Sequence, residues 1–114
     1  METEKTTHVT AQITQLRVAP SDDRRRVRLL AEVQDLAEPF PYLELSLIDP
    51  DGQVVATTLV MGIMEPQLQM TLHCRPPVAE GETRPFRARG RLFFGKEAEE
   101  EETFSVLETK FSFP

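Results

Sequence analysis

Apolar residues recur at every second position along most of this chain, in short runs separated by turn-forming sequences. An apolar–polar alternation of this kind is typical of β-strands that bury one face. In residues 67–74, for example, Leu68, Met70 and Leu72 share one face, while the residues between them are glutamine, threonine and histidine. The pattern predicts strands over residues 8–18, 26–33, 42–48, 53–60, 67–74, 86–94 and 103–113.

The connection between the third and fourth predicted strands has a specific turn sequence, Asp49-Pro50-Asp51-Gly52. Pro50 fixes φ at a turn corner, and Asp49 can accept hydrogen bonds from the backbone that follows it. Gly52 supplies the positive φ that other residues adopt at a cost of about 1 kcal/mol or more. The sequence therefore predicts a type I turn followed by a left-handed glycine, a common loop of β-hairpins.

The number and spacing of the predicted strands favour an all-β fold, a two-sheet antiparallel sandwich of about seven strands. Residues 95–102 contain helix-forming residues but no apolar stripe, so no helix is predicted there. The first run changes phase between Ile13 and Leu16, which indicates a β-bulge or a change of strand partner. The length predicts one domain over residues 1–114, with residues 1–7 as a disordered tail.

Two segments also resemble a known superfamily. LELSLIDPDGQVV (residues 43–55) is similar to the third strand, turn and fourth strand of immunoglobulin-like and fibronectin type III domains. VAEGETRPFRARGRLFFG (residues 78–95) is similar to the approach to their sixth strand, where Phe86 stands at the place of a frequent tyrosine. Phe86 can supply the packing of that tyrosine but not its hydroxyl. The resemblance implies an immunoglobulin-like sandwich, and it implies no catalytic residues.

Charge and composition narrow the classes of partner. A net charge of −6 argues against nucleic acid, whose affinity comes mostly from lysine and arginine, and against an anionic membrane surface. No run approaches the ~20 apolar residues of a membrane helix, and the first residues do not form a secretory signal. Cys74 is the only cysteine, so an intramolecular disulfide is impossible. We expect a cytoplasmic protein.

Carboxylates in two turns are candidate metal ligands. In the immunoglobulin strand order, the turns holding Asp22, Asp23, Asp49 and Asp51 share one end of the sandwich. Calcium takes several carboxylates from loops, so a calcium site is one alternative. Each aspartate also suits a turn, and the arginines at positions 24–26 are placed to neutralise them. We favour the turn interpretation.

The remaining metal-binding and catalytic candidates do not form a set. His73 and Cys74 are adjacent on a predicted strand, so their side chains point to opposite faces, and His8 begins a different strand. No zinc site or cofactor is predicted, because zinc needs three or four converging ligands. Cys74 has the inward phase of its strand and is predicted to be a core residue. An enzyme is not expected, although an unrecognised enzyme or small-ligand binder remains an alternative.

Four apolar residues are candidates for a contact with a protein partner: Phe40, Met61, Ile63 and Met64. They lie in the loops at the end of the sandwich opposite the aspartate turns. If exposed together, they would form an apolar patch of the kind that marks an interaction site. If buried, they would plug that end of the core or form an edge strand.

Charged runs give two further candidates. The acidic run at residues 97–102, which would either face a basic partner or form a solvated loop, includes Glu99, Glu100 and Glu101. The outward arginines at 87, 89 and 91 would bind an anion or pair with glutamates on neighbouring strands, and we favour pairing. We therefore expect a non-catalytic binding or assembly module, acting through this loop end or through edge-strand pairing into a homodimer.

Overall fold

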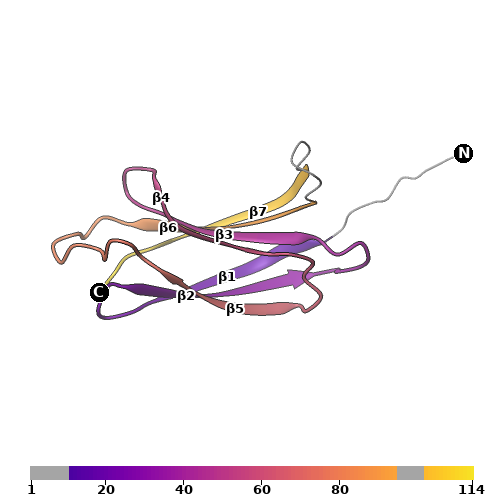
Figure 1. Cartoon of the computed structure of the whole chain (residues 1–114), viewed down its shortest axis with the longest axis horizontal. Helices are drawn as coiled ribbons and strands as arrows, with labels where there is room; N and C mark the ends of the chain where they lie inside the picture. The colour runs from indigo at the N-terminus through magenta and orange to yellow at the C-terminus, as the bar shows by residue number, and fades with distance from the viewer. Residues whose placement is uncertain (1–10, 95–101) are drawn as a thin grey trace, which may run out of the picture.

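The computed structural model describes residues 11–94 and 102–114, which form seven β-strands (Figure 1). The strands are β1 (Gln12–Pro20), β2 (Arg26–Gln34), β3 (Tyr42–Ile48), β4 (Val54–Val60), β5 (Gln67–His73), β6 (Phe86–Phe94) and β7 (Glu102–Phe111). These residues contain no helix, and hence none that could span a membrane. The predicted tail at residues 1–7 lies outside the described residues.

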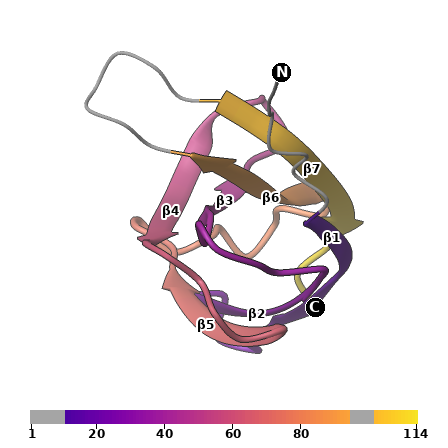
Figure 2. The ribbon, with the colours of Figure 1, turned by 90° about the vertical axis from the view of Figure 1, so that its right-hand side faces the viewer.

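The strands form two antiparallel sheets that pack face to face. The three-stranded sheet has the order β1-β2-β5, and the four-stranded sheet has the order β4-β3-β6-β7. Viewed along the sandwich, β1 and β7 border one side, while β4 and β5 border the other (Figure 2). The predicted all-β, two-sheet architecture is confirmed.

The two sides of the sandwich differ in how they are closed. On the β1–β7 side, the backbone N–H of Ile13 donates to Oγ of Ser105 at 3.1 Å. Oγ1 of Thr109 donates to the backbone oxygen of Leu16 at 3.2 Å. On the opposite side, β4 pairs only with β3 and β5 only with β2 among the described strands. That side therefore leaves two strand edges without a hydrogen-bonded neighbour strand.

The core lies between the sheets and follows the alternation of the sequence. Leu43, Leu45 and Leu47 of β3 are all fully buried, and burial of such a side chain stabilises the fold by roughly 1.5–3 kcal/mol. Gly90 occupies an inward position on β6, where an added Cβ would lie 3.2 Å from Cδ1 of Ile13. The lack of a side chain there lets the two sheets approach closely.

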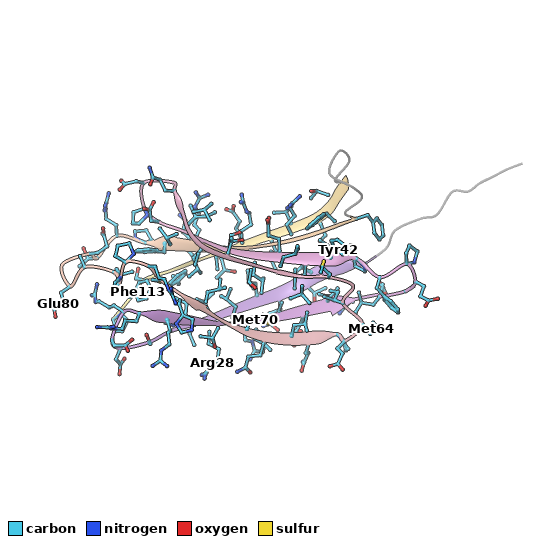
Figure 3. The ribbon with its side chains drawn as sticks, in the orientation of Figure 1. Arg28, Tyr42, Met64, Met70, Glu80 and Phe113 are labelled. Atoms are coloured by element: carbon cyan, nitrogen blue, oxygen red, sulfur yellow. The ribbon has the colours of Figure 1, made fainter. Side chains whose placement is uncertain are left out.

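An aromatic cluster closes the core near the C-terminus. The ring of Phe86 lies 5.8 Å from that of Phe111 and 5.1 Å from that of Phe113, between centroids. Phe113 lies between the two sheets, whereas Arg28 of β2 points away from the sandwich (Figure 3). Phe86 is buried, so it provides the packing expected at its position.

Several local predictions are confirmed. The strands β3 and β6 have the predicted bounds, and β1 has a register shift between Ile13 and Gln15 where the sequence changes phase. In the β3–β4 turn, the backbone N–H of Gly52 donates to the backbone oxygen of Asp49 at 2.9 Å, and Gly52 has φ of 89°. The predicted start of the first strand at residue 8 lies outside the described residues.

Candidate interaction surface

Asp49 and Asp51, two of the candidate calcium ligands, make hydrogen bonds in and around the β3–β4 turn. Oδ1 of Asp49 accepts hydrogen bonds from the backbone N–H groups of Asp51 (2.9 Å) and Gln53 (2.8 Å). Oδ1 of Asp51 accepts a bond from Nη1 of Arg84 at 3.1 Å. These carboxylates hold the turn and an ion pair, which is the role that the turn interpretation gave to Asp49.

The other two candidate ligands lie in the β1–β2 turn. Oδ1 of Asp23 accepts bonds from Oγ of Ser21 (2.5 Å) and from the backbone N–H of Arg25 (3.1 Å). These bonds, with Arg26 nearby, lower the pKa of Asp23. Asp22 is exposed. In the part of the chain that the structure describes, no group of three or more His, Cys, Asp or Glu side chains could hold a metal ion.

Arg24 has a role that the sequence did not reveal. Its Nη1 donates to the backbone oxygens of Ala79 (2.6 Å) and Glu82 (3.1 Å), and its Nη2 donates to the backbone oxygen of Pro114 (2.7 Å). Its own backbone oxygen accepts a bond from the N–H of Val78 at 3.0 Å. One side chain therefore links the β1–β2 turn, the β5–β6 loop and the C-terminal segment.

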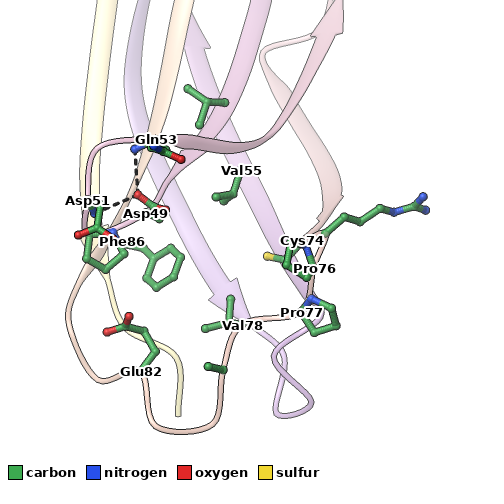
Figure 4. Close-up of a pocket in the computed structure, with 14 residues that line it drawn as sticks. Asp49, Asp51, Gln53, Val55, Cys74, Pro76, Pro77, Val78, Glu82 and Phe86 are labelled. Carbon is green, nitrogen blue, oxygen red and sulfur yellow. Dashed lines mark hydrogen bonds between the residues drawn. The ribbon is translucent and has the colours of Figure 1, made fainter.

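A cleft of about 420 Å³ opens at the same end, between the β3–β4 turn and the β5–β6 loop (Figure 4). Val55, Val78 and Phe86 are among the apolar residues that line it. Cys74 also borders the cleft, but it is only 4% exposed, and burial raises the pKa of its thiol. The structure thus places Cys74 in the core, as predicted.

The acidic side chains of the cleft are engaged as well. Hydrogen bonds from Arg84 lower the pKa of Glu82 to about 2. His73, the neighbour of Cys74, is exposed on the opposite face of its strand. The cleft therefore combines apolar walls with carboxylates already held by turns and ion pairs.

At the opposite end, the four apolar candidates separate into two groups. Ile63 is only 2% exposed, and its backbone N–H donates to the backbone oxygen of Pro41 at 2.8 Å. Phe40 is half-buried. Met61 and Met64 are 68% and 67% exposed, and Met64 projects at this end (Figure 3). Ile63 thus plugs the core, and the two methionines form the exposed part of the predicted patch.

The acidic run at residues 97–102 lies outside the residues whose side chains the structure describes. This applies to all three of its candidate contact residues: Glu99, Glu100 and Glu101. Their proposed role as a contact with a basic partner stays a prediction.

Strand β4 ends directly before Met61, one of the two exposed methionines. Residues 54–60 read VVATTLV and contain no charged side chain. Val54 and Leu59 are about half exposed, at 53% and 49%. A register shift near Ile48 interrupts the ladder at the start of β4, so residues 56–60 form its regular part. We use "β4 edge" for strand β4 together with Met61.

The outward face of the four-stranded sheet carries the predicted row of arginines. Nη1 of Arg87 lies 3.2 Å from Oε1 of Glu108 on β7. Nε of Arg91 lies 3.0 Å from Oε1 of Glu44 on β3, and its guanidinium lies 4.1 Å from the ring centroid of Phe93. For these two arginines the predicted cross-strand pairing is confirmed.

Comparisons with known proteins give a fold and no family. No family model matches this chain, and no curated protein matches its sequence. A solved structure of the β-glucuronidase from Lactobacillus rhamnosus is similar over 90% of this chain, with a TM-score of 0.50 and 15% sequence identity. The chain spans only 16% of the length of that enzyme. At this identity the similarity supports the β-sandwich fold alone.

Proposed function

We propose that this domain is a non-catalytic assembly module, and that its β4 edge pairs with the same strand of a second copy. Such pairing would extend the four-stranded sheet through backbone hydrogen bonds between two β4 strands. The observation that carries the proposal is an edge strand that is free of charge and carries the exposed apolar residues Val54 and Leu59, with exposed Met61 at its end.

The β4 edge lacks most of the features that normally prevent edge pairing. Natural edge strands are protected by lysine, proline, inward-facing charges or bulges. Residues 54–60 contain neither lysine nor proline, and the single irregularity at their start leaves residues 56–60 regular. On the other side of the same sheet, β7 carries Glu108 and Lys110 and is tied to β1 by side-chain hydrogen bonds.

The sequence of β4 is also suited to pairing with itself. Antiparallel pairing about Thr58 places Thr57 opposite Leu59 of the second copy, and Ala56 opposite Val60. The two residues of each pair lie on the same face of the sheet. Thr57 and Leu59 point outward, whereas Ala56, Thr58 and Val60 lie opposite inward residues of β3. No like charges meet, although each copy has a net charge of −6.

The class of the sandwich and its non-catalytic role are proposed on separate observations. The strand order and the turn sequence support an immunoglobulin-like or fibronectin type III-like class, and we propose this class on the sequence resemblance given above. The likeness to part of a glycosidase carries no activity to this chain. The carboxylates of the cleft already make turns and ion pairs, which supports a non-catalytic role.

Light scattering across a concentration series tests the proposal. We expect the mass of the wild-type chain to rise from 13.0 kDa towards twice that value. The regular part of the edge, residues 56–60, is too short to bury the roughly 800 Å² per partner of a stable interface. We therefore expect the concentration of half-association to lie between about 10 μM and 1 mM. A chain that stays monomeric throughout this range contradicts the proposal.

Matched lysine substitutions locate the interface. Leu59→Lys adds a charge to the exposed β4 edge and should keep the chain monomeric, because lysine is a natural edge protector. Gln69→Lys adds the same charge to an exposed position on β5, the edge of the other sheet, and should leave association unchanged. The reverse result, in which only Gln69→Lys blocks association, assigns the interface to β5 and refutes the β4 assignment.

A further inference from the structure

The centre of the outward face of the four-stranded sheet is a row of three guanidinium groups. Ala88 and Leu92 are fully buried, which directs the alternate residues Arg87, Arg89 and Arg91 away from the core. Neighbours two positions apart on a strand lie about 7 Å from each other. The row therefore concentrates positive charge along the middle of one face.

Among the described residues, only the two outer arginines of this row are paired with a carboxylate. Glu108 is the direct cross-strand neighbour of Arg89, but its Oε1 contacts Nη1 of Arg87 at 3.2 Å. On the other side, the cross-strand neighbour of Arg89 is Ser46, whose hydroxyl is within 3.2 Å of Oγ1 of Thr57. Within residues 11–94 and 102–114, the half-buried side chain of Arg89 makes no hydrogen bond or ion pair.

The charge of this face is opposite in sign to that of the whole chain. Its described outward side chains include two acidic residues, Glu44 and Glu108, and four basic ones: Arg87, Arg89, Arg91 and Lys110. These described side chains sum to a formal charge of +2, on a chain of net charge −6. An acidic partner is attracted to this face and repelled by much of the remaining surface.

Exposed apolar side chains flank the arginine row on both sides. Leu59 of β4 and Val106 of β7 are 49% and 52% exposed. Across the four strands, Leu59 is the neighbour of Glu44, and Val106 is the neighbour of Arg91, which itself pairs with Glu44. This line of cross-strand neighbours lies next to the line that passes through Arg89. A ligand that covers Arg89 and the adjacent line of cross-strand neighbours contacts a cation, Arg89, and two apolar side chains, Leu59 and Val106.

We propose that this face binds an acidic polypeptide segment, with a carboxylate on Arg89 and apolar side chains on Leu59 and Val106. A guanidinium presents a planar pair of donors that matches a carboxylate. The flanking apolar contacts favour a polypeptide over nucleic acid, because a phosphate backbone offers them no apolar partner and meets the repulsion of the acidic chain. This site does not depend on pairing through β4.

Fluorescence polarisation with a labelled peptide tests the site. The probe is an extended peptide in which valine and glutamate alternate at every second position with serine between them, so that one face presents both. Arg89→Gln should weaken its binding by about tenfold or more, the loss expected for one charge-assisted contact. Arg28→Gln removes the same charge from an exposed position on the outward face of the other sheet, and it should leave the affinity within about twofold.

A third variant moves the affinity in the opposite direction. Glu108→Gln removes a carboxylate that competes with the peptide for the arginines of β6, so it should tighten binding of the peptide. The same peptide with glutamine in place of glutamate should not bind, and added salt should weaken the wild-type complex. Circular dichroism and the Tm of each variant establish that it is folded.

Three results would overturn the proposal. In the first, the wild-type chain does not bind the acidic peptide. In the second, Arg89→Gln and Arg28→Gln weaken binding equally, which means that attraction is non-specific. In the third, a labelled single-stranded oligonucleotide binds more tightly than the peptide and depends on Arg89, which assigns the face to nucleic acid. A monomeric chain that still binds the peptide through Arg89 refutes only the β4 pairing.

Discussion

Arg24 is the residue whose removal should most clearly loosen one end of this sandwich. Its guanidinium donates to the backbone oxygens of Ala79, Glu82 and Pro114, at 2.6, 3.1 and 2.7 Å. These oxygens belong to two segments that lie 55 to 90 residues away along the chain. Replacement by alanine leaves all three oxygens without this donor and releases the contact between the segments.

The size of the effect follows from the exposure of the bonds. A hydrogen bond to a charged group contributes about 1.5–3 kcal/mol when it is buried. Two of the three bonds are exposed and one is part-buried, so water replaces much of what is lost. We expect Arg24→Ala to lower the free energy of unfolding by about 2 kcal/mol, or to lower the Tm by roughly 8 °C.

The backbone of Arg24 provides an internal comparison. Its φ is 61°, in the left-handed region that glycine adopts without strain. Arg24→Gly loses the same three bonds but relieves this conformation, so it should be more stable than Arg24→Ala by about 1 kcal/mol. Arg24→Lys keeps the charge but lacks the planar fork that reaches several oxygens at once, so it should recover little of the loss.

Urea denaturation followed by circular dichroism measures these differences. Arg25→Ala is the control, because Arg25 is exposed in the same turn and its removal changes the net charge equally. We expect Arg25→Ala to remain within about 0.5 kcal/mol of wild type. The reasoning fails if Arg24→Ala is as stable as Arg25→Ala, or if Arg24→Gly is less stable than Arg24→Ala.

Two further predictions concern ionisable groups. Burial raises the pKa of the Cys74 thiol, so iodoacetamide at pH 8 should modify the folded protein at least about tenfold more slowly than the urea-unfolded protein; equal rates would show that Cys74 is accessible. Hydrogen bonds from Arg84 lower the pKa of Glu82 from 4.5 to about 2, so its stabilising contribution is present above pH 4.5 and is lost as the pH falls towards 2. The Tm difference between wild type and Glu82→Gln should shrink over this range, and a constant difference would refute the pKa assignment.

The parts of the fold that could be predicted depend on local sequence. Alternation has a period of two residues, so it identified the strands and the inward leucines of β3 without knowledge of their partners. The phase change after Ile13 revealed the bulge of β1, and the positive φ of Gly52 followed from its turn. Each of these properties is decided by residues a few positions apart.

The features that could not be predicted depend on residues far apart in the chain. The bonds of Arg24 join segments that are distant in sequence, and its neighbours Asp22 and Asp23 suggested a different role. Ile63 was grouped with exposed methionines, because a loop sequence does not show which side chain turns into the core. Among the described residues, the Arg89 side chain lacks a partner because Glu108 contacts Arg87, and alternation alone does not show which of two nearby arginines a glutamate will contact.

The two proposed surfaces have a geometric relation that follows from the sheet order. Antiparallel pairing of two β4 strands has its two-fold axis perpendicular to the sheet, so the outward faces of both copies lie on the same side of one continuous sheet. Between the two β6 strands there are five strand-to-strand steps: β6 to β3, β3 to β4, β4 to β4, and the same two steps reversed. At about 4.8 Å a step, the arginine rows of the two copies lie roughly 24 Å apart.

One acidic polypeptide with two suitable segments can then bind both arginine rows, and the second contact is favoured by the high effective concentration that the first creates. Under these two proposals, weak pairing through β4 and weak binding at Arg89 would reinforce each other, because each would increase the occupancy of the other.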